Sequence, residues 1–366
     1  MRFFKFYAVA TVFLFVTACT GQAAPKINAN SDLEMAIKDI AEANKFNGVI
    51  LVSTPDRPVI SKAFGHADIE QDRPLKTDTT FNIASISKSF SAALTMQLVE
   101  QGMLSLDDTL KDHLPDLEVS DADKITIRQL LQNRSGLAHT TDIPGWFDPA
   151  WKAAQTPETF LKAALDVPLK TTPGTEYYYS NIGYYLLGLI IDRATGTTYE
   201  KALETAMLTP LNMAHTGQVY AAKQPENHAL NYLMIDDKLT QIQLSNTWMF
   251  RASASLYSNA EDMLKWSNAL QNGNLLSDAS MATMFDRDAP MGWIVGEAPL
   301  TEGGKPTPIR TYNGDLAGYT TILTYFPHTG MTVILLGNMS PGYNTVLGMT
   351  LQIAAAAQNS SKTGSP

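Results

Sequence analysis

A serine and a lysine, three residues apart, form the first pair in this sequence that could do covalent chemistry. Ser85 and Lys88 begin a helical pattern that runs to about Gln101. Residues three apart lie on one face of a helix, so the Lys88 amine can reach the Ser85 hydroxyl. A serine hydroxyl attacks well only when a base takes its proton, and lysine is a base only when neutral. The pair predicts a nucleophile and its base; a capping serine and a solvated lysine are the alternative.

A second proton-transfer group is offered by the sequence Tyr-Ser-Asn, which occurs at Tyr179-Ser180-Asn181 and again at Tyr257-Ser258-Asn259. A positioned phenol can transfer a proton, which such chemistry needs. The second copy has a structural explanation, because Ser258 and Glu261 have the spacing of a capping box before a helical pattern. The first copy follows a turn at Pro173-Gly174-Thr175, and turns often present functional side chains. We therefore predict that the first copy is the functional one.

The composition is that of an ordinary globular protein with an acidic balance. Of its 366 residues, 45% are hydrophobic and 17% are charged, and the formal net charge is −9. No block of Lys or Arg stands out, and phosphate neutralisation drives most nucleic-acid affinity. We therefore expect no nucleic-acid partner, and the covalent chemistry predicted above would act on a small-molecule or peptide substrate.

The first residues have the features of an export signal. Arg2 and Lys5 form a positive start, and residues 7–16 are apolar but too few for a stable membrane span. Cys19 then follows small residues and is the only cysteine of the chain, so no disulfide forms within it. The stretch resembles a bacterial lipobox, in which the chain is cut before a cysteine that is then lipidated. A buried or incidental thiol is the alternative.

The lipobox resemblance implies how the chain is attached to the cell. We expect residues 1–18 to be a signal peptide and residues 19–30 to be a lipid-anchored tether. The location implied is the bacterial cell envelope, on the periplasmic face, with the lipid as the only membrane contact. Thr20 after the cysteine favours the outer membrane, by analogy with lipoprotein sorting.

Strand patterns occur at both ends of the chain, and helical patterns fill the middle. This order predicts an α/β fold in which an antiparallel sheet from both chain ends is sandwiched by helices. A helical insertion lobe covers about residues 104–276, and the whole domain spans 31–358. A cleft between the two parts is the expected place for a site. The predicted strands are 48–53, 58–64, 309–312, 319–326 and 331–336; the clearest helices are 32–45, 85–101, 182–194 and 343–358, with one more opening at Thr156-Pro157.

Four segments in order resemble a known family. They are FNIASISKSF at 81–90, ITIRQLLQNRSGL at 125–137, PGTEYYYSNIGYYLLG at 173–188 and LYSNAEDMLKW at 256–266. Together they resemble the class C β-lactamase and penicillin-binding-protein-like serine hydrolases, which include DD-peptidases, D-aminopeptidases and esterases. The resemblance covers roughly residues 47–339. It implies an α/β sandwich with a helical lobe, as the strand and helix order also predicts.

The resemblance also implies a role for each matching residue. Ser85 would be the nucleophile that forms an acyl-enzyme. Lys88 and Tyr179 would share the roles of general base and acid, and Asn181 would orient the substrate amide or the lysine. No cofactor is implied.

The family has a third motif, Lys-Thr-Gly or often His-x-Gly, on an edge strand that faces the nucleophile. Lys362-Thr363-Gly364 has the right letters but follows the last predicted helix. It lies within residues 359–366, a polar tail that we expect to be disordered. We therefore interpret it as a chance match.

The better match is TYNGDLAGY at residues 311–319, beside two strand patterns, which resembles the family's H-x-G-G-x-x-G-F. Tyr312 then stands in place of the basic residue, and Gly314 keeps the glycine. The Asp315 backbone N–H would complete an oxyanion hole with that of Ser85. A turn with a packed tyrosine is the alternative.

Tyr312 affects the expected substrate, because a phenol is neutral at pH 7 and cannot attract a carboxylate as a cation would. β-Lactams and peptides that end in D-Ala carry that carboxylate. We expect weak activity on both and a preference for esters or an unusual amide. The alternatives are a non-catalytic muropeptide-binding lipoprotein and a penicillin-binding sensor that does not turn over.

The remaining candidates are interpreted as structural. No pair of histidines has metal-ligand spacing on one helix, so each is interpreted as solvated or core and no metal is expected. Trp293 is interpreted as a packing residue first and a cleft wall second, and Tyr177 and Tyr178 as core aromatics. The histidines are His66, His113, His139, His215, His228 and His328.

Overall fold

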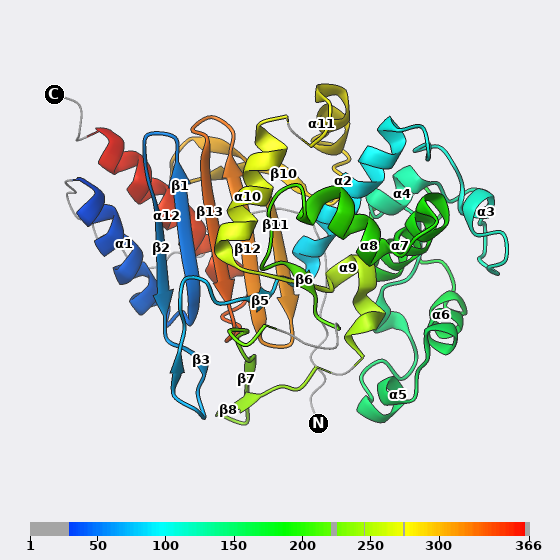
Figure 1. Cartoon of the computed structure of the whole chain (residues 1–366), viewed down its shortest axis with the longest axis horizontal. Helices are drawn as coiled ribbons and strands as arrows, with labels where there is room; N and C mark the ends of the chain where they lie inside the picture. The colour runs from blue at the N-terminus through cyan, green and yellow to red at the C-terminus, as the bar shows by residue number, and fades with distance from the viewer. Residues whose placement is uncertain (1–28, 221–224, 245, 274, 363–366) are drawn as a thin grey trace.

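One antiparallel sheet of six strands is the framework of the molecule (Figure 1). The computed structural model describes residues 29–220, 225–244, 246–273 and 275–362. Strands from both ends of the chain meet in the sheet, in the order β10-β11-β12-β13-β1-β2, which confirms the predicted fold class. The strands are β1 Gly48–Thr54, β2 Arg57–Phe64, β10 Ile294–Pro299, β11 Pro306–Leu316, β12 Tyr319–Phe326 and β13 Met331–Gly337.

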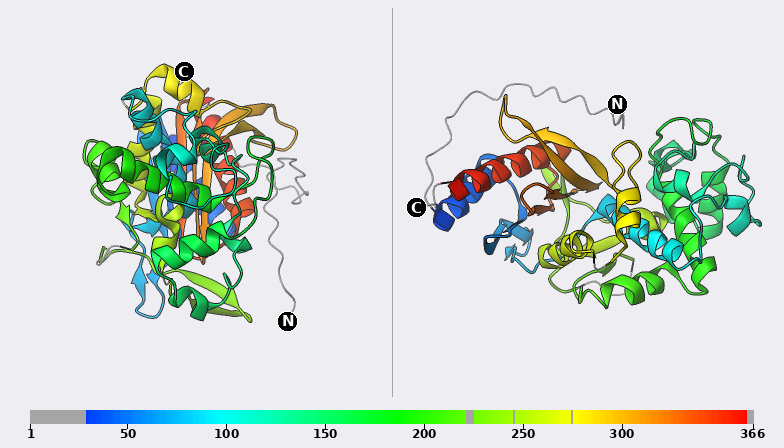
Figure 2. Two further views of the ribbon diagram at one scale, coloured as in Figure 1. Left: turned by 90° about the vertical axis from the view of Figure 1, so that its right-hand side faces the viewer. Right: turned by 90° about the horizontal axis from the view of Figure 1, so that it is seen from above.

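Helices cover both faces of the sheet, so its central strands are buried on both sides. Along β1, Val49 and Leu51 join one core cluster, whereas Ile50 and Val52 join the other. This is why the strand reads as an unbroken apolar run rather than an alternation. Seen from above, α1 and α12 lie on one side of the sheet, and α2 and α10 on the other (Figure 2). These helices are α1 Ala29–Ala43, α2 Ser87–Glu100, α10 Ala260–Gln271 and α12 Tyr343–Lys362.

The helical lobe lies beside the sheet, beyond α2 (Figure 1). Thr156 caps α6 with Pro157 at its first position, as predicted. Helix α7 ends at Gly196, whose φ of +66° suits glycine, again as predicted. The helices of the lobe are α3 Leu110–His113, α4 Ile127–Leu131, α5 Pro149–Ala153, α6 Pro157–Leu165, α7 Asn181–Thr195, α8 Tyr199–Leu203 and α9 Arg251–Ala254, with a π-helical turn at Glu204–Leu208 and 3-10 turns at Thr140–Asp142 and Thr247–Phe250.

Short pairings between distant segments complete the fold. β5 Phe81–Asn82 and β6 Gly217–Gln218 both pair with β9 Leu256–Ser258, which ties the start of α2 to the end of the lobe. Sequence patterns this short gave no prediction of these strands. The other short elements are β3 His66–Asp68, β4 Arg73–Pro74, β7 Tyr232–Ile235, β8 Lys238–Gln241 and α11 Asp278–Met284.

The structure differs from the predicted organisation in three larger respects. The lobe does not extend to residue 276, because α10 packs on β1 and β13 and so belongs to the sheet. Strand β10 was missed, although it is the edge strand beside β11. Helix α12 continues to Lys362, and Ser360 is buried, so the predicted disordered tail begins too early.

The predicted signal peptide, 1–18, and Cys19 lie outside the described residues. Of the predicted tether, 19–30, only Ala29 and Asn30 are described, and they begin α1. Within the described ranges, no helix has the length and apolar character needed to cross a membrane.

Candidate active site

Ser85 lies at the junction of the sheet half and the lobe, in a single 3-10 turn, Ala84–Ile86, just before α2. Ala84 has φ of +45°, a left-handed conformation that costs energy for a residue with a Cβ. Neighbouring bonds hold it there: Asn82 Oδ1 accepts from the Ala84 N–H at 2.8 Å, and the Ser87 hydroxyl donates to the Ala84 carbonyl at 2.6 Å. The turn leaves Ser85 partly exposed while its neighbours in the turn are buried.

Lys88 is fully buried one helical turn further on. Its Nζ lies 3.2 Å from Ser85 Oγ, and it donates to Asn181 Oδ1 at 2.7 Å and to the Ser253 carbonyl at 2.8 Å. Burial without a carboxylate partner holds the pKa of Lys88 well below its ordinary value. The surroundings therefore favour a neutral amine, the form that can accept a proton.

Tyr179 places its hydroxyl 2.7 Å from Ser85 Oγ, and its ring lies 4.8 Å from Lys88 Nζ. Burial raises the pKa of this phenol far above its ordinary value, with hydrogen bonds to Ser85 and Tyr312 working in the opposite direction. The phenol is therefore protonated at neutral pH, and it lies beside an amine whose charged form is disfavoured by burial.

The loop that carries Tyr179 is fixed at the start of α7. Ser180 caps the helix by accepting from the Gly183 N–H at 3.0 Å. Asn133, with φ of +53°, accepts from the Ser180 N–H through its side chain and from the Tyr178 N–H through its carbonyl. These bonds aim Tyr179 and Asn181 at the Ser85 turn.

Strand β11 closes the other side of the site. A Cβ added at Gly314 would lie 2.1 Å from the Ile83 carbonyl oxygen, so only glycine fits against the turn before Ser85. The Thr321 hydroxyl of β12 donates to the same carbonyl at 3.1 Å. Tyr312 is buried and hydrogen-bonds to Tyr179. The structure thus brings the predicted third motif next to the turn that carries Ser85.

Asp315 follows Gly314 on β11. Its side chain is exposed, and a carboxylate oxygen accepts from the Thr320 hydroxyl at 3.2 Å. The carboxylate is therefore tied to the neighbouring strand β12.

Two aromatic residues next to the site were interpreted wrongly. Tyr177 is not a core residue, because 45% of it is exposed. Tyr178 is half-buried and donates to Asp142 at 2.9 Å. Both residues lie in the loop before α7, where there is no helix or strand periodicity from which to predict which side chains are buried.

His139 was also not predicted as a site residue. Its ring lies 5.4 Å from that of Tyr179, and its Nδ1 accepts from the Thr141 N–H at 3.2 Å. Burial lowers the pKa of His139 to about 4, so the imidazole is neutral at pH 7. Its position in the segment just after ITIRQLLQNRSGL was the available signal.

The two rejected matches lie elsewhere. Asn259, not Ser258, caps α10 by accepting from the Asp262 N–H at 2.9 Å, so the second Tyr-Ser-Asn is structural but the proposed capping box is wrong. Lys362 ends α12, which covers the sheet face opposite α2, whereas Thr363 and Gly364 lie outside the described residues.

One histidine and the tryptophan are structural, as interpreted from the sequence. His228 is buried between Thr80 and Tyr319, as a core histidine. Trp293 is buried against Phe285, as predicted for packing. Within the described ranges, no group of three or more His, Cys, Asp or Glu side chains could hold a metal ion.

Comparison with known proteins agrees with this geometry. The Beta-lactamase family profile matches residues 33–358, and the chain belongs to this family. A penicillin-binding protein of Bacillus subtilis (strain 168) is 26% identical over 338 residues, which cover 86% of this chain and 72% of that protein. D-amino acid amidase from Ochrobactrum anthropi SV3, solved with D-phenylalanine, superposes with a TM-score of 0.79 at 25% identity, over 90% of this chain and 99% of that one.

A penicillin-binding protein from Bacillus halodurans shares the fold, with a TM-score of 0.73 at 24% identity over 88% of this chain and 98% of that one. Family, fold and relatives together make this protein a β-lactamase-related serine hydrolase.

Proposed function

We propose that the protein hydrolyses a small ester or amide through an acyl-enzyme on Ser85, with Lys88 as the base. The observation that carries the proposal is the position of Ser85 Oγ, 2.7 Å from the Tyr179 hydroxyl and 3.2 Å from Lys88 Nζ. A buried amine kept neutral and a buried phenol kept protonated are a matched base and acid.

In the proposed first step, Lys88 takes the Ser85 proton as Oγ bonds to the substrate carbonyl carbon. The N–H groups of Ser85 and Asp315 stabilise the negative oxygen that forms. The bond to the leaving group then breaks, and the leaving group receives a proton from Lys88 through the Tyr179 hydroxyl. In the second step water attacks the acyl group and gives up a proton to Lys88 or Tyr179. The bond between the acyl carbon and Ser85 Oγ then breaks, Ser85 Oγ regains a proton from these residues, and the acid is released.

The charge of the site favours a neutral substrate. Tyr312 holds the third-motif position, and burial raises its pKa further, so it carries no charge at pH 7. His139 is neutral as well. With no cation at these two positions, a substrate carboxylate would lose solvation without gaining a partner. Esters and uncharged amides are therefore the proposed substrates, and D-amino-acid amides are the first to test because a D-amino acid amidase is a structural relative.

The experiment is labelling and turnover in matched variants. A fluorophosphonate should label Ser85 in the wild type and not in Ser85→Ala. Tyr179→Phe should lower turnover of a short-chain ester by at least tenfold, whereas Tyr257→Phe, in the second copy of the motif, should leave it unchanged. Labelling that persists in Ser85→Ala, or equal loss in both tyrosine variants, would contradict the proposal.

A second candidate is a protein that is acylated by penicillin and does not turn over. Its specific support is that several relatives are named as penicillin-binding proteins, together with the missing basic residue at Tyr312. A stable adduct of a fluorescent penicillin at Ser85, with no ester or amide turnover, would favour this candidate over the first.

We also propose that the protein is exported and anchored in the bacterial envelope through lipid on Cys19. The support is the apolar segment at residues 7–16 and the small residues before Cys19. Metabolic labelling with an alkyne fatty acid in a bacterial host should mark the full chain and not Cys19→Ala; label retained in the variant would exclude this site.

A further inference from the structure

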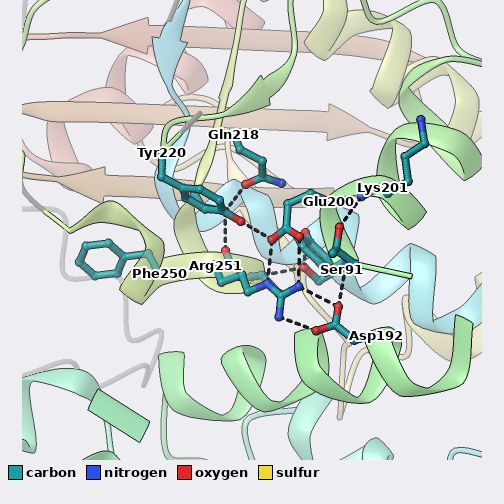
Figure 3. A network of polar contacts seen from close by, with 12 residues as sticks. Ser91, Asp192, Glu200, Lys201, Gln218, Tyr220, Phe250 and Arg251 are labelled. Carbon is teal, nitrogen blue, oxygen red and sulfur yellow. Dashed lines mark hydrogen bonds and ion pairs between the residues drawn. The ribbon is translucent and has the colours of Figure 1, made fainter. Parts of the chain in front are cut away.

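A partly buried cluster of charges (Figure 3) is linked to the proposed base through α9, and no step proposed above uses it. Arg251, at the start of α9, bonds to both oxygens of Asp192 on α7, each at 2.7 Å. The same guanidinium bonds to Glu200 on α8 at 2.7 and 3.1 Å. Tyr220 adds a short hydrogen bond to Glu200. One arginine therefore joins three helices through four hydrogen bonds.

The pair of Arg251 and Glu200 stays charged over a wide pH range. The Arg251 side chain is only 14% exposed. Although burial opposes it, the bonds from Arg251 and Tyr220 lower the pKa of Glu200 to about 2. The two carboxylates raise the pKa of Arg251 in turn. Two-sided pairing of this kind fixes a planar guanidinium in both position and orientation.

Helix α9 connects Arg251 to the site, because the same short helix carries a carbonyl that contacts Lys88. Its carbonyls accept hydrogen bonds one after another along the short segment. The Ser255 hydroxyl donates to the Arg251 carbonyl at 2.6 Å, and the Ser91 hydroxyl of α2 donates to the Ala252 carbonyl at 2.6 Å. The next carbonyl, that of Ser253, accepts from Lys88 Nζ. Arg251 is therefore two residues from a direct partner of the base.

The Ser253 carbonyl matters because a neutral amine has two N–H groups and one lone pair. Asn181 Oδ1 and the Ser253 carbonyl oxygen can only accept, and they are the two closest partners of Lys88 Nζ, at 2.7 and 2.8 Å. They take both N–H groups. The lone pair is then left for Ser85 Oγ, the third partner, at 3.2 Å.

We propose that Arg251 is a positioning residue for acylation, which holds the Ser253 carbonyl so that the Lys88 lone pair faces Ser85. The inference rests on the proposed role of Lys88 as base. Arg251 touches neither the reacting atoms nor Lys88. Its effect is on the orientation of the amine, and therefore on the rate at which Ser85 loses its proton.

The test compares a variant in which all three charged residues are neutral with a variant that leaves these charges in place and removes one nearby hydrogen bond. A triple variant, Arg251→Gln with Asp192→Asn and Glu200→Gln, removes the pairing without leaving a buried charge unpaired. Ser91→Ala removes the bond to the Ala252 carbonyl. Arg193→Met is the matched control. Arg193 lies on α7, as Asp192 does, but its ion pair with Asp116 is on the surface.

The readouts are the rate constant for acylation by an ester, per fluorophosphonate-titrated site, and the dissociation constant of that ester before acylation. We expect the triple variant to acylate at least tenfold more slowly and Ser91→Ala about fivefold more slowly, both with dissociation constants within twofold of wild type. Arg251→Lys, which keeps one charge but not the fork, should fall between wild type and the triple variant. Arg193→Met should match wild type.

Acylation at the wild-type rate in the folded triple variant would overturn the proposal. If the triple variant does not fold, Ser91→Ala becomes the deciding variant. An unchanged acylation rate in Ser91→Ala would then overturn the proposal as well. A lower melting temperature with an unchanged rate per site would show a purely structural role, and also overturns it. A wild type that is not labelled at Ser85 overturns both this proposal and the proposed function, whereas a labelled wild type with unaffected variants overturns this proposal alone.

Discussion

A methyl group at Gly314 should slow acylation strongly without unfolding the protein. The Cβ of Gly314→Ala would lie 2.1 Å from the Ile83 carbonyl oxygen, whereas ordinary contacts begin at 3.4 Å. β11 and the turn that carries Ser85 must then separate by about 1.3 Å, the difference between these distances. Displacements of about 1 Å in a preorganised site cost on the order of 10²-fold in rate. That corresponds to about 2.7 kcal/mol in the barrier.

The assay is kcat/KM for a short-chain p-nitrophenyl ester, with the thermal unfolding midpoint measured on the same samples. Gly296→Ala is the matched control, because Gly296 lies on the neighbouring strand β10 and an added Cβ there meets no atom within 4 Å. We expect a loss of about a hundredfold for Gly314→Ala and none for the control. A folded Gly314→Ala protein with kcat/KM within threefold of wild type would refute the placement of β11 against the nucleophile.

Three further predictions concern the phenol at the third motif, pH and a helix cap. Tyr312→Phe removes a hydrogen bond to Tyr179 and should lower kcat/KM about fivefold, by about 1 kcal/mol; an unchanged value would show that the bond is not used. In the proposed mechanism the neutral amine of Lys88 is the base, and the pKa of Lys88 lies well below its ordinary value. The acylation rate should therefore rise with pH through that lowered pKa and reach its plateau at a lower pH than the pKa of free lysine. An acylation rate that falls as the pH is raised over that range would exclude Lys88 as the base. Thr156→Ala removes the cap of α6 and should lower the unfolding midpoint by about 2 °C, from a loss of about 1 kcal/mol, without affecting kcat/KM.

The parts of the fold predicted well are those with strong local signals. β12 was predicted at its observed bounds, and α7 ends at the glycine expected. The errors lie where local signals are weak or shared. Ser258 and Asn259 are both good capping residues in adjacent positions, and only the backbone shows that Asn259 is the cap. Residues 359–362 are polar, yet they continue a helix that the sheet already supports.

The limits are different at the site. Side chains of a conspicuous type, such as Ser85, Lys88 and Tyr179, could be proposed as site residues from spacing and order, and the structure brings them together. The Ser253 carbonyl could not, because a backbone acceptor has no signature in the sequence and lies 165 residues from its partner. The acid–base state of Lys88 was also beyond the sequence, since it depends on complete burial by segments far apart in the chain.

The strand order of the sheet has a consequence for how the chain reaches this fold. β13 lies between β12 and β1, and next to this pairing the side chains of Asn47 and Asn338 bond across 291 residues of sequence. The apolar hairpin of β1 and β2 is made first but has no neighbouring strand until nearly the whole chain exists. Pairings so distant in sequence slow folding and leave strand edges open to other chains. A chain that lacks β13 therefore leaves open the edge of β1 that β13 covers, and such an edge is a template for pairing with another chain.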